Sequence, residues 1–454
     1  MFIDSLLNKT DTIYSSLSAE TKFSIASTEK NKLSNLANEL DYSEIIQLEF
    51  YVQEQIAKGK EICDLIIGDF DTTQFPIPAF LRQEIQNAYE ARHNDYPPLE
   101  GVYSLREEIA KLTRKNFNVD YDPSGEIIIS GGARPLLYAA LLSLVSPSEL
   151  VVYPAPSWNN MYYAKMCGAK SMAIQTSLAN HFLPTARDLS FSLKKARVLS
   201  LCSPQNPVGT MFSKQVLKEI CDLVIYENKR RLMYSEKPLY LIYDQIYWML
   251  TQNAEHYNPA SLCPEIKDYL IVIDGGSKSF AATGIRVGWA MGPKLVINKM
   301  KLMIEHIGAI APKAEQLAMA ALLKNDKYLL DYLHLFKNKI LNSMLVLHTA
   351  IQTMKQEGLP VDSMLPMAGI YISINFDLKN KVMPNGKKIK TAKDISLYFI
   401  DQAGIAIVPF TSFGTTSIEA DNWFRAAICT IAPEQIAATI PRLREAILKL
   451  NIAA

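Results

Sequence analysis

The feature that most constrains the fold of this chain is an alternation of short apolar segments with longer helical ones between residues 76 and 325. The apolar segments are rich in Ile, Val and Leu and do not alternate with polar residues, which is typical of parallel strands covered on both faces. Strands are predicted at Glu126–Ser130, Glu149–Tyr153, Ser171–Gln175, Val198–Cys202, Leu239–Tyr243 and Tyr269–Ile273. The pattern therefore predicts an α/β protein with a mostly parallel sheet between layers of helices.

The length of 454 residues is too great for one simple core and favours two domains. After residue 325 the pattern becomes helical and then gives apolar strands near Ile370–Ile374 and at Ile405–Val408. We expect an N-terminal arm or extension (1–35), a large domain (76–325) and a smaller α+β domain made of two segments (36–75 and 326–454). The arm is rich in Ser, Thr, Asn and Lys, and no chemistry is assigned to it.

The composition argues against several classes of function. Charged residues make up 20% and the formal net charge is +1, so neither nucleic acid nor an anionic membrane is expected as a partner. The chain shows no signal peptide at its start and no uncharged apolar stretch of the ~18 residues that a membrane span needs. Its six cysteines and six histidines show no metal-ligand or redox spacing. We expect a cytoplasmic protein without a metal.

Glycine-rich and polar segments follow several predicted strands, at the sheet edge where open α/β sheets bind ligands. Gly131-Gly132-Ala133-Arg134 follows the first strand and opens a helix, whose free amides favour an anion such as phosphate. Trp158 follows the second strand and could stack on a planar ring. Asn206-Pro207-Val208-Gly209 follows the fourth, where proline and glycine fix the direction of the Asn206 amide. Each segment alone equally suits a structural turn or plain packing.

Two further strand ends carry ionisable residues. Asp244 follows an apolar strand, with Tyr247 three residues later, and an acid there is costly unless it meets a cation or hydrogen-bond donors. The last strand of the series leads to Ser277-Lys278-Ser279 and then to Thr283-Gly284-Ile285-Arg286. A lone lysine is usually a solvated surface charge. Five strands of one sheet thus end in glycine-rich, polar or ionisable residues, and packing alone hardly explains so many. Together these strand ends predict a ligand site.

In combination these residues resemble the class I and II aminotransferases of the aspartate aminotransferase superfamily, which are pyridoxal 5′-phosphate (PLP) enzymes of fold type I. The segment Ser277–Gly288 is close to the lysine-to-arginine signature of that family, and Asn206-Pro207-x-Gly209, Asp244-x-x-Tyr247 and Arg425 have family-like order and spacing. The resemblance covers about residues 40 to 450. It implies a large domain with a mostly parallel seven-stranded sheet, a smaller α+β domain, PLP as cofactor and a homodimer with shared active sites.

The resemblance implies a role for each residue around the cofactor ring. Lys278 would form a Schiff base with PLP and, once freed, carry a proton between the substrate and the cofactor. Asp244 would pair with the pyridine nitrogen, so that the ring withdraws electrons from the substrate. Asn206 and Tyr247 would hydrogen-bond the phenolic oxygen, and Trp158 would stack on the ring.

The resemblance also implies how the phosphate and the substrate are bound. The phosphate would be held by Arg286, Ser277, the amides of Gly132 and Ala133, and Tyr96 reaching across from the neighbouring subunit. The α-carboxylate of the substrate would be held by Arg425, with Gly68, Trp158 and Asn206 beside it. The implied ping-pong reaction moves an amino group from an L-amino acid, with aspartate as the first choice, to a 2-oxo acid, with 2-oxoglutarate as the first choice.

Several alternatives stay open at this point. An aromatic or broad-specificity transaminase is one, because Ala133 stands where an aspartate-using subgroup has a lysine, and Arg134 either replaces that lysine or points to bulk water. A PLP-dependent lyase or an aminocyclopropane carboxylate synthase-like enzyme is another, since these share the same ionic residues. A non-enzymatic regulator of the same fold is not expected, because residues 1–35 show no basic helix-turn-helix pattern. Insertions near 230–238 and 252–264 have no assigned function.

Overall fold

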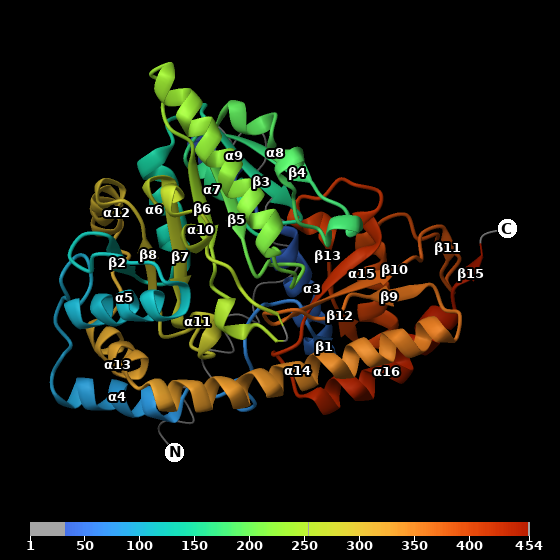
Figure 1. Cartoon of the computed structure of the whole chain (residues 1–454). Helices are drawn as coiled ribbons and strands as arrows, with labels where there is room; N and C mark the ends of the chain where they lie inside the picture. The colour runs from blue at the N-terminus through green and yellow to red at the C-terminus, as the bar shows by residue number, and fades with distance from the viewer. Residues whose placement is uncertain (1–31, 253, 453–454) are drawn as a thin grey trace.

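The computed structural model describes residues 32–252 and 254–452, so most of the expected N-terminal arm lies outside the described residues. The described chain forms a larger part around a seven-stranded sheet and a smaller part around a four-stranded sheet (Figure 1). The long helix α14 (Asp326–Gln356) runs along both parts at the bottom of the view. Segments far apart in the chain meet in the smaller part, because β1 (Cys63–Asp64) pairs in parallel with β12 (Ile405–Ala406).

The seven-stranded sheet confirms the predicted α/β class and has the strand order β2-β8-β7-β6-β5-β3-β4. Its strands are β2 (Ile127–Ser130), β3 (Leu150–Ala155), β4 (Lys170–Gln175), β5 (Ala196–Cys202), β6 (Tyr240–Asp244), β7 (Leu270–Gly275) and β8 (Gly288–Met291). All the predicted strands are present, but β8 is missing from the prediction. It runs antiparallel to both neighbours, whereas the other pairs are parallel. Its four residues, Gly288 to Met291, include no Ile or Val, whereas the equally short β2 begins with three isoleucines.

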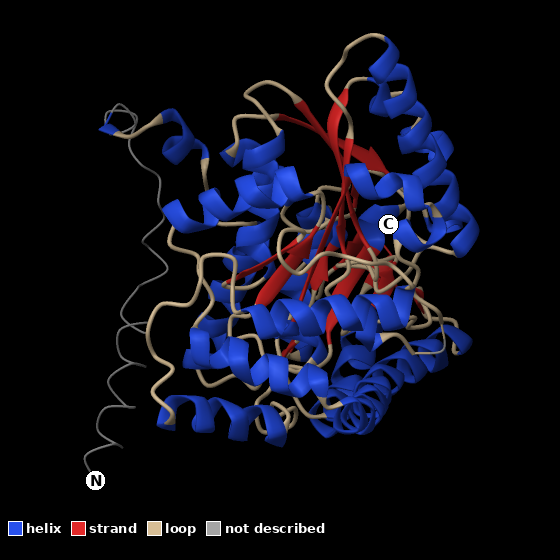
Figure 2. Ribbon diagram, turned by 60° about the vertical axis from the view of Figure 1, so that its left-hand side comes forward, coloured by secondary structure: helices blue, strands red, loops and turns tan. Residues whose placement is uncertain are grey.

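The continuous apolar character of the strands follows from burial on both faces of the sheet, as β7 shows. Leu270 and Val272 pack into the core on one face, and Ile271 and Ile273 pack into the core on the other. All four side chains are fully buried. The first face is covered by α5 (Tyr103–Phe117), α9 (Lys214–Met233) and α13 (Lys313–Lys324), and the second by α6 (Ala133–Leu144), α7 (Asn160–Met166) and α12 (Lys294–His306). Figure 2 shows the resulting layers of helices on both sides of the strands.

The smaller part is built on an antiparallel sheet of order β13-β14-β10-β9. Its strands are β9 (Val361–Ser363), β10 (Tyr371–Phe376), β13 (Val408–Pro409) and β14 (Trp423–Ala427), and α14, α15 (Ala392–Ala403) and α16 (Pro433–Leu448) share its core. The strand predicted near Ile370–Ile374 is present as β10. The single strand predicted at Ile405–Val408 is wrong, because Ile407 separates β12 from β13, which belong to different sheets. A buried apolar run carries no sign of a change of partner strand.

The remaining described helices and strands are short or lie at the margins of the fold. They are α2 (Asn35–Glu39), α3 (Glu44–Ala57), α4 (Ala79–Glu90), α8 (Ala186–Leu189), α10 (Pro259–Leu262), α11 (Gly276–Ser279), β11 (Lys381–Val382) and β15 (Asn451–Ile452). No described helix is both long and apolar enough to cross a membrane. Within residues 32–252 and 254–452, no three His, Cys, Asp or Glu side chains gather as a metal-binding group.

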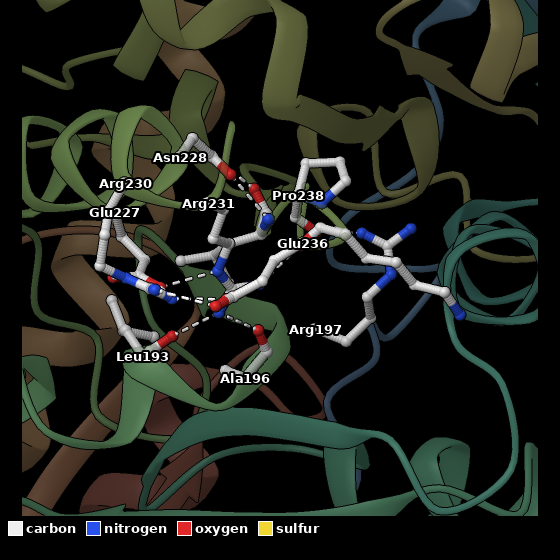
Figure 3. A network of polar contacts seen from close by, with 11 residues as sticks. Leu193, Ala196, Arg197, Glu227, Asn228, Arg230, Arg231, Glu236 and Pro238 are labelled. Atoms are coloured by element: carbon white, nitrogen blue, oxygen red, sulfur yellow. Dashed lines mark hydrogen bonds and ion pairs between the residues drawn. The ribbon is translucent and has the colours of Figure 1, made fainter. Parts of the chain in front are cut away.

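The insertion near residues 230–238 has a structural role at the end of α9 (Figure 3). Arg231 is 5% exposed, and its Nε donates to the Glu227 carboxylate at 2.7 Å. Three backbone carbonyls accept further hydrogen bonds from Arg231, namely those of Leu193, Ala196 and Lys237. Arg230 donates to the same carboxylate at 2.8 Å, so the buried charge of Glu227 is paired twice. The insertion thereby ties α9 to the starts of β5 and β6.

Candidate active site

A cavity of about 560 Å³ opens beyond the carboxyl ends of β5, β6 and β7 and is lined by residues of both parts. Its lining includes the predicted residues Gly68, Ala133, Trp158, Asn206, Asp244, Tyr247, Ser277, Lys278, Arg286 and Arg425. Gly132 does not line the cavity but is next to Ala133, at the start of α6. Tyr96 is 90% exposed and lies outside the cavity. The structure thus brings together nearly all of the residues that the strand ends singled out.

Lys278 stands on α11, directly after β7, and points its amine into the cavity. Its Nζ donates a hydrogen bond to the carbonyl oxygen of Gly68. Burial lowers the pKa of Lys278 to about 8, and the Asp69 carboxylate opposes this shift while Arg425 and Arg134 add to it. A lysine with a pKa near 8 presents an appreciable fraction of neutral amine at physiological pH, and the neutral amine is the nucleophile and base.

Asp244 ends β6 and lies at the floor of the cavity. Its Oδ1 accepts a hydrogen bond of 3.0 Å from the backbone N–H of Ile246. Among the described residues, no Lys, Arg or His forms an ion pair with this carboxylate, and burial raises the pKa of Asp244 to about 6. A cationic group in the cavity would stabilise the charged form of Asp244.

Gly132 and Arg286 form a cradle suited to an anion. Gly132 has φ +100°, and a Cβ atom on it would lie 2.3 Å from Nη2 of Arg286, so only glycine lets the guanidinium approach. Helix α6 begins at the next residue without a side-chain cap, which leaves its first amides free. Arg286 is fixed by hydrogen bonds to the carbonyls of Gly131, at 2.8 Å, and Thr283, at 2.7 Å. Free amides beside a guanidinium are the typical surroundings of a bound phosphate.

Arg425 lies on β14 and is 2% exposed. Its Nη1 donates to Oδ1 of Asn206 at 3.0 Å, its Nη2 donates to the carbonyl of Ile66, and its Nε has no hydrogen-bond partner among the described residues. The guanidinium carbon lies 4.7 Å from the ring centre of Tyr371 and 4.8 Å from that of Phe413. No carboxylate of the described chain pairs with it. A buried cation without a counterion is costly, so this arrangement suits a ligand that brings a carboxylate.

The sequence matches the family model described as aminotransferase class I and II over residues 60–443. The chain belongs to this family. It is 26% identical to an aspartate aminotransferase of Rhizobium meliloti, over 90% of this chain and 93% of that protein. It is 28% identical to a bifunctional aspartate aminotransferase and glutamate/aspartate-prephenate aminotransferase of Petunia hybrida, over 84% of this chain and 77% of that protein. The crystal structure of the aspartate aminotransferase from Rhizobium meliloti has the same fold, with a TM-score of 0.83, 23% identity, and coverage of 92% of this chain and 99% of that chain.

Aminotransferases of this family use PLP, and the cavity fits each portion of that cofactor. The amides and guanidinium at Gly132 and Arg286 fit the phosphate, and Asp244, which lacks a cationic partner, fits a protonated ring nitrogen. The amine of Lys278 lies in the same cavity and fits the aldehyde. When bound, PLP supplies an electron-withdrawing ring that accepts the electron pair left when a bond to the substrate Cα breaks.

Arg134, whose direction the sequence left open, lines the cavity of this aminotransferase and is also exposed to solvent. Its guanidinium carbon lies 4.3 Å from the centre of the Trp158 ring, a distance typical of a cation–π contact. In the described part of the chain, no side chain forms an ion pair with Arg134. The guanidinium of Arg134 therefore lies at the cavity wall, while its side chain is also exposed to solvent.

Tyr371 is a site residue that the sequence analysis missed. It begins β10, lines the cavity and places its hydroxyl oxygen 2.9 Å from that of Tyr247. The two tyrosines are separated by 124 residues in the chain, and no spacing motif links them. The prediction of a strand near Ile370–Ile374 was the available signal, because a strand that enters the site could have drawn attention to its first residue.

Proposed function

We propose that this aminotransferase moves the amino group of L-aspartate to 2-oxoglutarate in a ping-pong reaction, with PLP held covalently by Lys278. A single observation carries the proposal: Arg425 is buried without a carboxylate partner among the described residues and lines the same cavity as the Lys278 amine. A substrate carboxylate would pair this cation and place the adjoining carbon within the reach of the amine.

In this proposal the side chains divide the work between binding and proton transfer. Arg425 binds the α-carboxylate of the substrate, which fixes Cα beside the Lys278 amine. Lys278 would take the proton from Cα as general base and then deliver it to the bound cofactor as general acid. Asp244 keeps a proton on the ring nitrogen. Asn206 presents its amide N–H groups to the cavity, because its Oδ1 is occupied by Arg425.

Aspartate is proposed as donor because the cavity is lined by one arginine more than the phosphate and one carboxylate need. Arg425 is assigned to the α-carboxylate and Arg286 to the phosphate, which leaves Arg134 for the second carboxylate of a dicarboxylic substrate. The names of the relatives from Rhizobium meliloti and Petunia hybrida support the same choice. An aromatic or broad-specificity transaminase is the alternative, supported by the Trp158 ring in the cavity wall.

We further propose a cytoplasmic homodimer in which Tyr96 completes the active site of the neighbouring subunit. An aromatic side chain that is 90% exposed in the single chain supports a contact with another protein surface. Within each subunit, the proposed domains are residues 36–75 with 326–454 and residues 76–325. Separate hydrophobic cores around the two main sheets support this division.

Absorbance spectra of the PLP-bound protein with single amino acids and no oxo acid test the substrate. Loss of the yellow band with aspartate and glutamate supports the proposal, whereas loss with aromatic donors alone would replace aspartate by an aromatic substrate. Release of free ammonia without an oxo acid would identify a lyase instead. Borohydride reduction followed by peptide mass spectrometry tests the attachment, and an adduct on any lysine other than Lys278 would refute it.

A further inference from the structure

We infer that Tyr371 is a positioning residue that joins the substrate-binding Arg425 to the cofactor-binding Tyr247. This inference rests on the proposed function, which assigns those two roles. The Tyr371 side chain is 2% exposed and contacts both residues at once. Its hydroxyl oxygen lies 2.9 Å from that of Tyr247, and the centre of its ring lies 4.7 Å from the guanidinium carbon of Arg425.

The hydroxyl of Tyr371 acts on Tyr247. Each tyrosine has one O–H donor, and burial raises the pKa of both hydroxyls, so both keep their protons near neutral pH. When Tyr247 donates its proton to the phenolic oxygen of the cofactor, its own oxygen is free to accept the proton of Tyr371. An O–H group that accepts a hydrogen bond becomes a stronger donor. Tyr371 therefore strengthens the hydrogen bond that Tyr247 gives to the cofactor.

The ring of Tyr371 acts on Arg425. Tyr371 and Phe413 each place a ring centre less than 5 Å from the guanidinium carbon, and a cation gains stability from aromatic rings where no counterion is present. These contacts hold the guanidinium in one orientation before the substrate arrives. A bidentate carboxylate contact depends on that orientation.

Gly68 shows that the position of Tyr371 is tightly specified. A Cβ atom on Gly68 would lie 2.1 Å from the Tyr371 hydroxyl oxygen, so a side chain at position 68 would displace the tyrosine. The carbonyl of the same glycine accepts the hydrogen bond from Lys278. The Tyr371 side chain thus contacts Tyr247, which is assigned to the cofactor, and Arg425, which is assigned to the substrate. It also lies beside Gly68, whose carbonyl accepts the hydrogen bond from Lys278.

Two variants separate the actions of the hydroxyl and the ring. Tyr371→Phe keeps the ring and removes the hydroxyl, whereas Tyr371→Leu removes both. Tyr398→Phe is the matched control, because it also removes a buried tyrosine hydroxyl with a 2.8 Å hydrogen bond, to the carbonyl of Ala446, but lies outside the cavity. The first readout is the pH midpoint of the visible cofactor band without substrate, and the second is kcat and KM for several amino donors.

Tyr371→Phe is expected to raise the midpoint of the cofactor band by about 0.5 to 1 pH unit, because weaker donation from Tyr247 leaves the phenolic oxygen a better proton acceptor. Its KM is expected to change less than about twofold. Tyr371→Leu is expected to raise KM roughly tenfold or more for all donors alike. An unchanged midpoint in Tyr371→Phe, or an equal shift in Tyr398→Phe, would overturn the inference. A wild-type protein without a visible band in excess PLP would overturn the proposed function itself, and this inference with it.

Discussion

The Nη1 atom of Arg425 lies 3.0 Å from the Oδ1 atom of Asn206, so the smaller part of the molecule fixes the amide of a residue that follows β5 in the larger part. The contact serves both residues. It gives Arg425 one of its few partners, and it fixes the oxygen end of the Asn206 amide, which lines the cavity. In the proposed function, this one hydrogen bond would link binding of the substrate to binding of the cofactor.

Substitution of Arg425 by Gln is expected to raise KM about 100-fold for every amino donor alike, because all donors carry the same α-carboxylate and a buried charge-assisted contact is worth a few kcal/mol. Steady-state kinetics with aspartate, glutamate and an aromatic donor check this expectation. Arg442→Gln is the control, since Arg442 is a surface residue with a 3.8 Å contact to Glu61. A defect confined to one donor would contradict the role assigned to Arg425.

Substitution of Lys278 by Ala is expected to reduce turnover by at least about 10³-fold while PLP still binds non-covalently, because both the covalent attachment and the proton carrier are lost. Lys229→Ala changes an exposed lysine that pairs with Glu265 and should behave as wild type. Turnover is measured under saturating PLP and substrates. Wild-type-like turnover of Lys278→Ala would remove the basis of the mechanism.

The pH dependence of cofactor attachment follows from the lowered pKa of Lys278. Below its pKa of about 8, the neutral fraction of the amine rises nearly tenfold with each pH unit, and above it the fraction levels off. We expect the rate at which the PLP-free protein forms its yellow band to follow this curve. A rate that continues to climb toward pH 10 would indicate an ordinary solvated lysine. Stopped-flow absorbance at constant PLP concentration measures it.

Asp274 is expected to make the stability of the protein depend on pH. Its carboxylate is 2% exposed and accepts hydrogen bonds from the Gly275 N–H and Trp248 Nε1, both at 2.7 Å, and burial raises its pKa to about 8. The unfolded chain has a carboxyl pKa near 3.9, so the folded state holds the extra proton between these values. The contribution of Asp274 to stability is therefore fully present below about pH 4 and is lost as the pH rises through 8.

Asp274→Asn removes this titration, so the Tm of the wild type relative to that of the variant should fall as the pH rises from 5 to 9. Differential scanning calorimetry on both proteins gives the comparison. Asp268→Asn alters an exposed carboxylate nearby and should leave the profile unchanged. Parallel Tm profiles for wild type and Asp274→Asn would show that the buried carboxyl does not titrate as expected.

Arg231→Met is expected to destabilise the protein by about 3 kcal/mol, because it leaves the buried Glu227 with one cation fewer and three backbone carbonyls without their donor. The double variant Arg231→Met, Glu227→Met should recover part of that loss, since no buried charge then lacks a partner. Urea unfolding measures both. Equal stability of Arg231→Met and wild type would mean that the network at the end of α9 is dispensable.

The sequence predicted most of the larger part because the strands inside its sheet, unlike the edge strand β4, are buried on both faces. Leu270 to Ile273 are apolar without a break for that reason, and the end of such a strand leads directly to Lys278. The features that the sequence did not predict share a physical origin, which is strand pairing between distant segments. β8 lacks the run of isoleucines that marks the equally short β2, and the segment around Ile407 changes sheets without a change in hydrophobicity.

Contacts of side chains were harder to predict than positions of strands. Tyr371 has no motif of its own, and its importance lies in a hydroxyl contact with Tyr247 across 124 residues of chain. The environment of Arg134 was equally hidden, because the stacking on Trp158 depends on how α6 is placed relative to the loop after β3. Sequence patterns of period two or 3.6 describe one helix or strand at a time, so they do not predict side-chain contacts between different elements.

The pairing of β1 with β12 has a consequence for folding during synthesis on the ribosome. Asp64 emerges early, but its partner strand begins at Ile405, and a ribosome adding 5 to 20 residues per second needs roughly 20 to 70 s to cover that interval. By the end of this interval Lys278 and Asp244 have been synthesised, whereas Arg425 has not. The nascent protein therefore passes through a stage in which the residues proposed to bind the cofactor are present before Arg425, which is proposed to bind the substrate, and in which β1 is still unpaired.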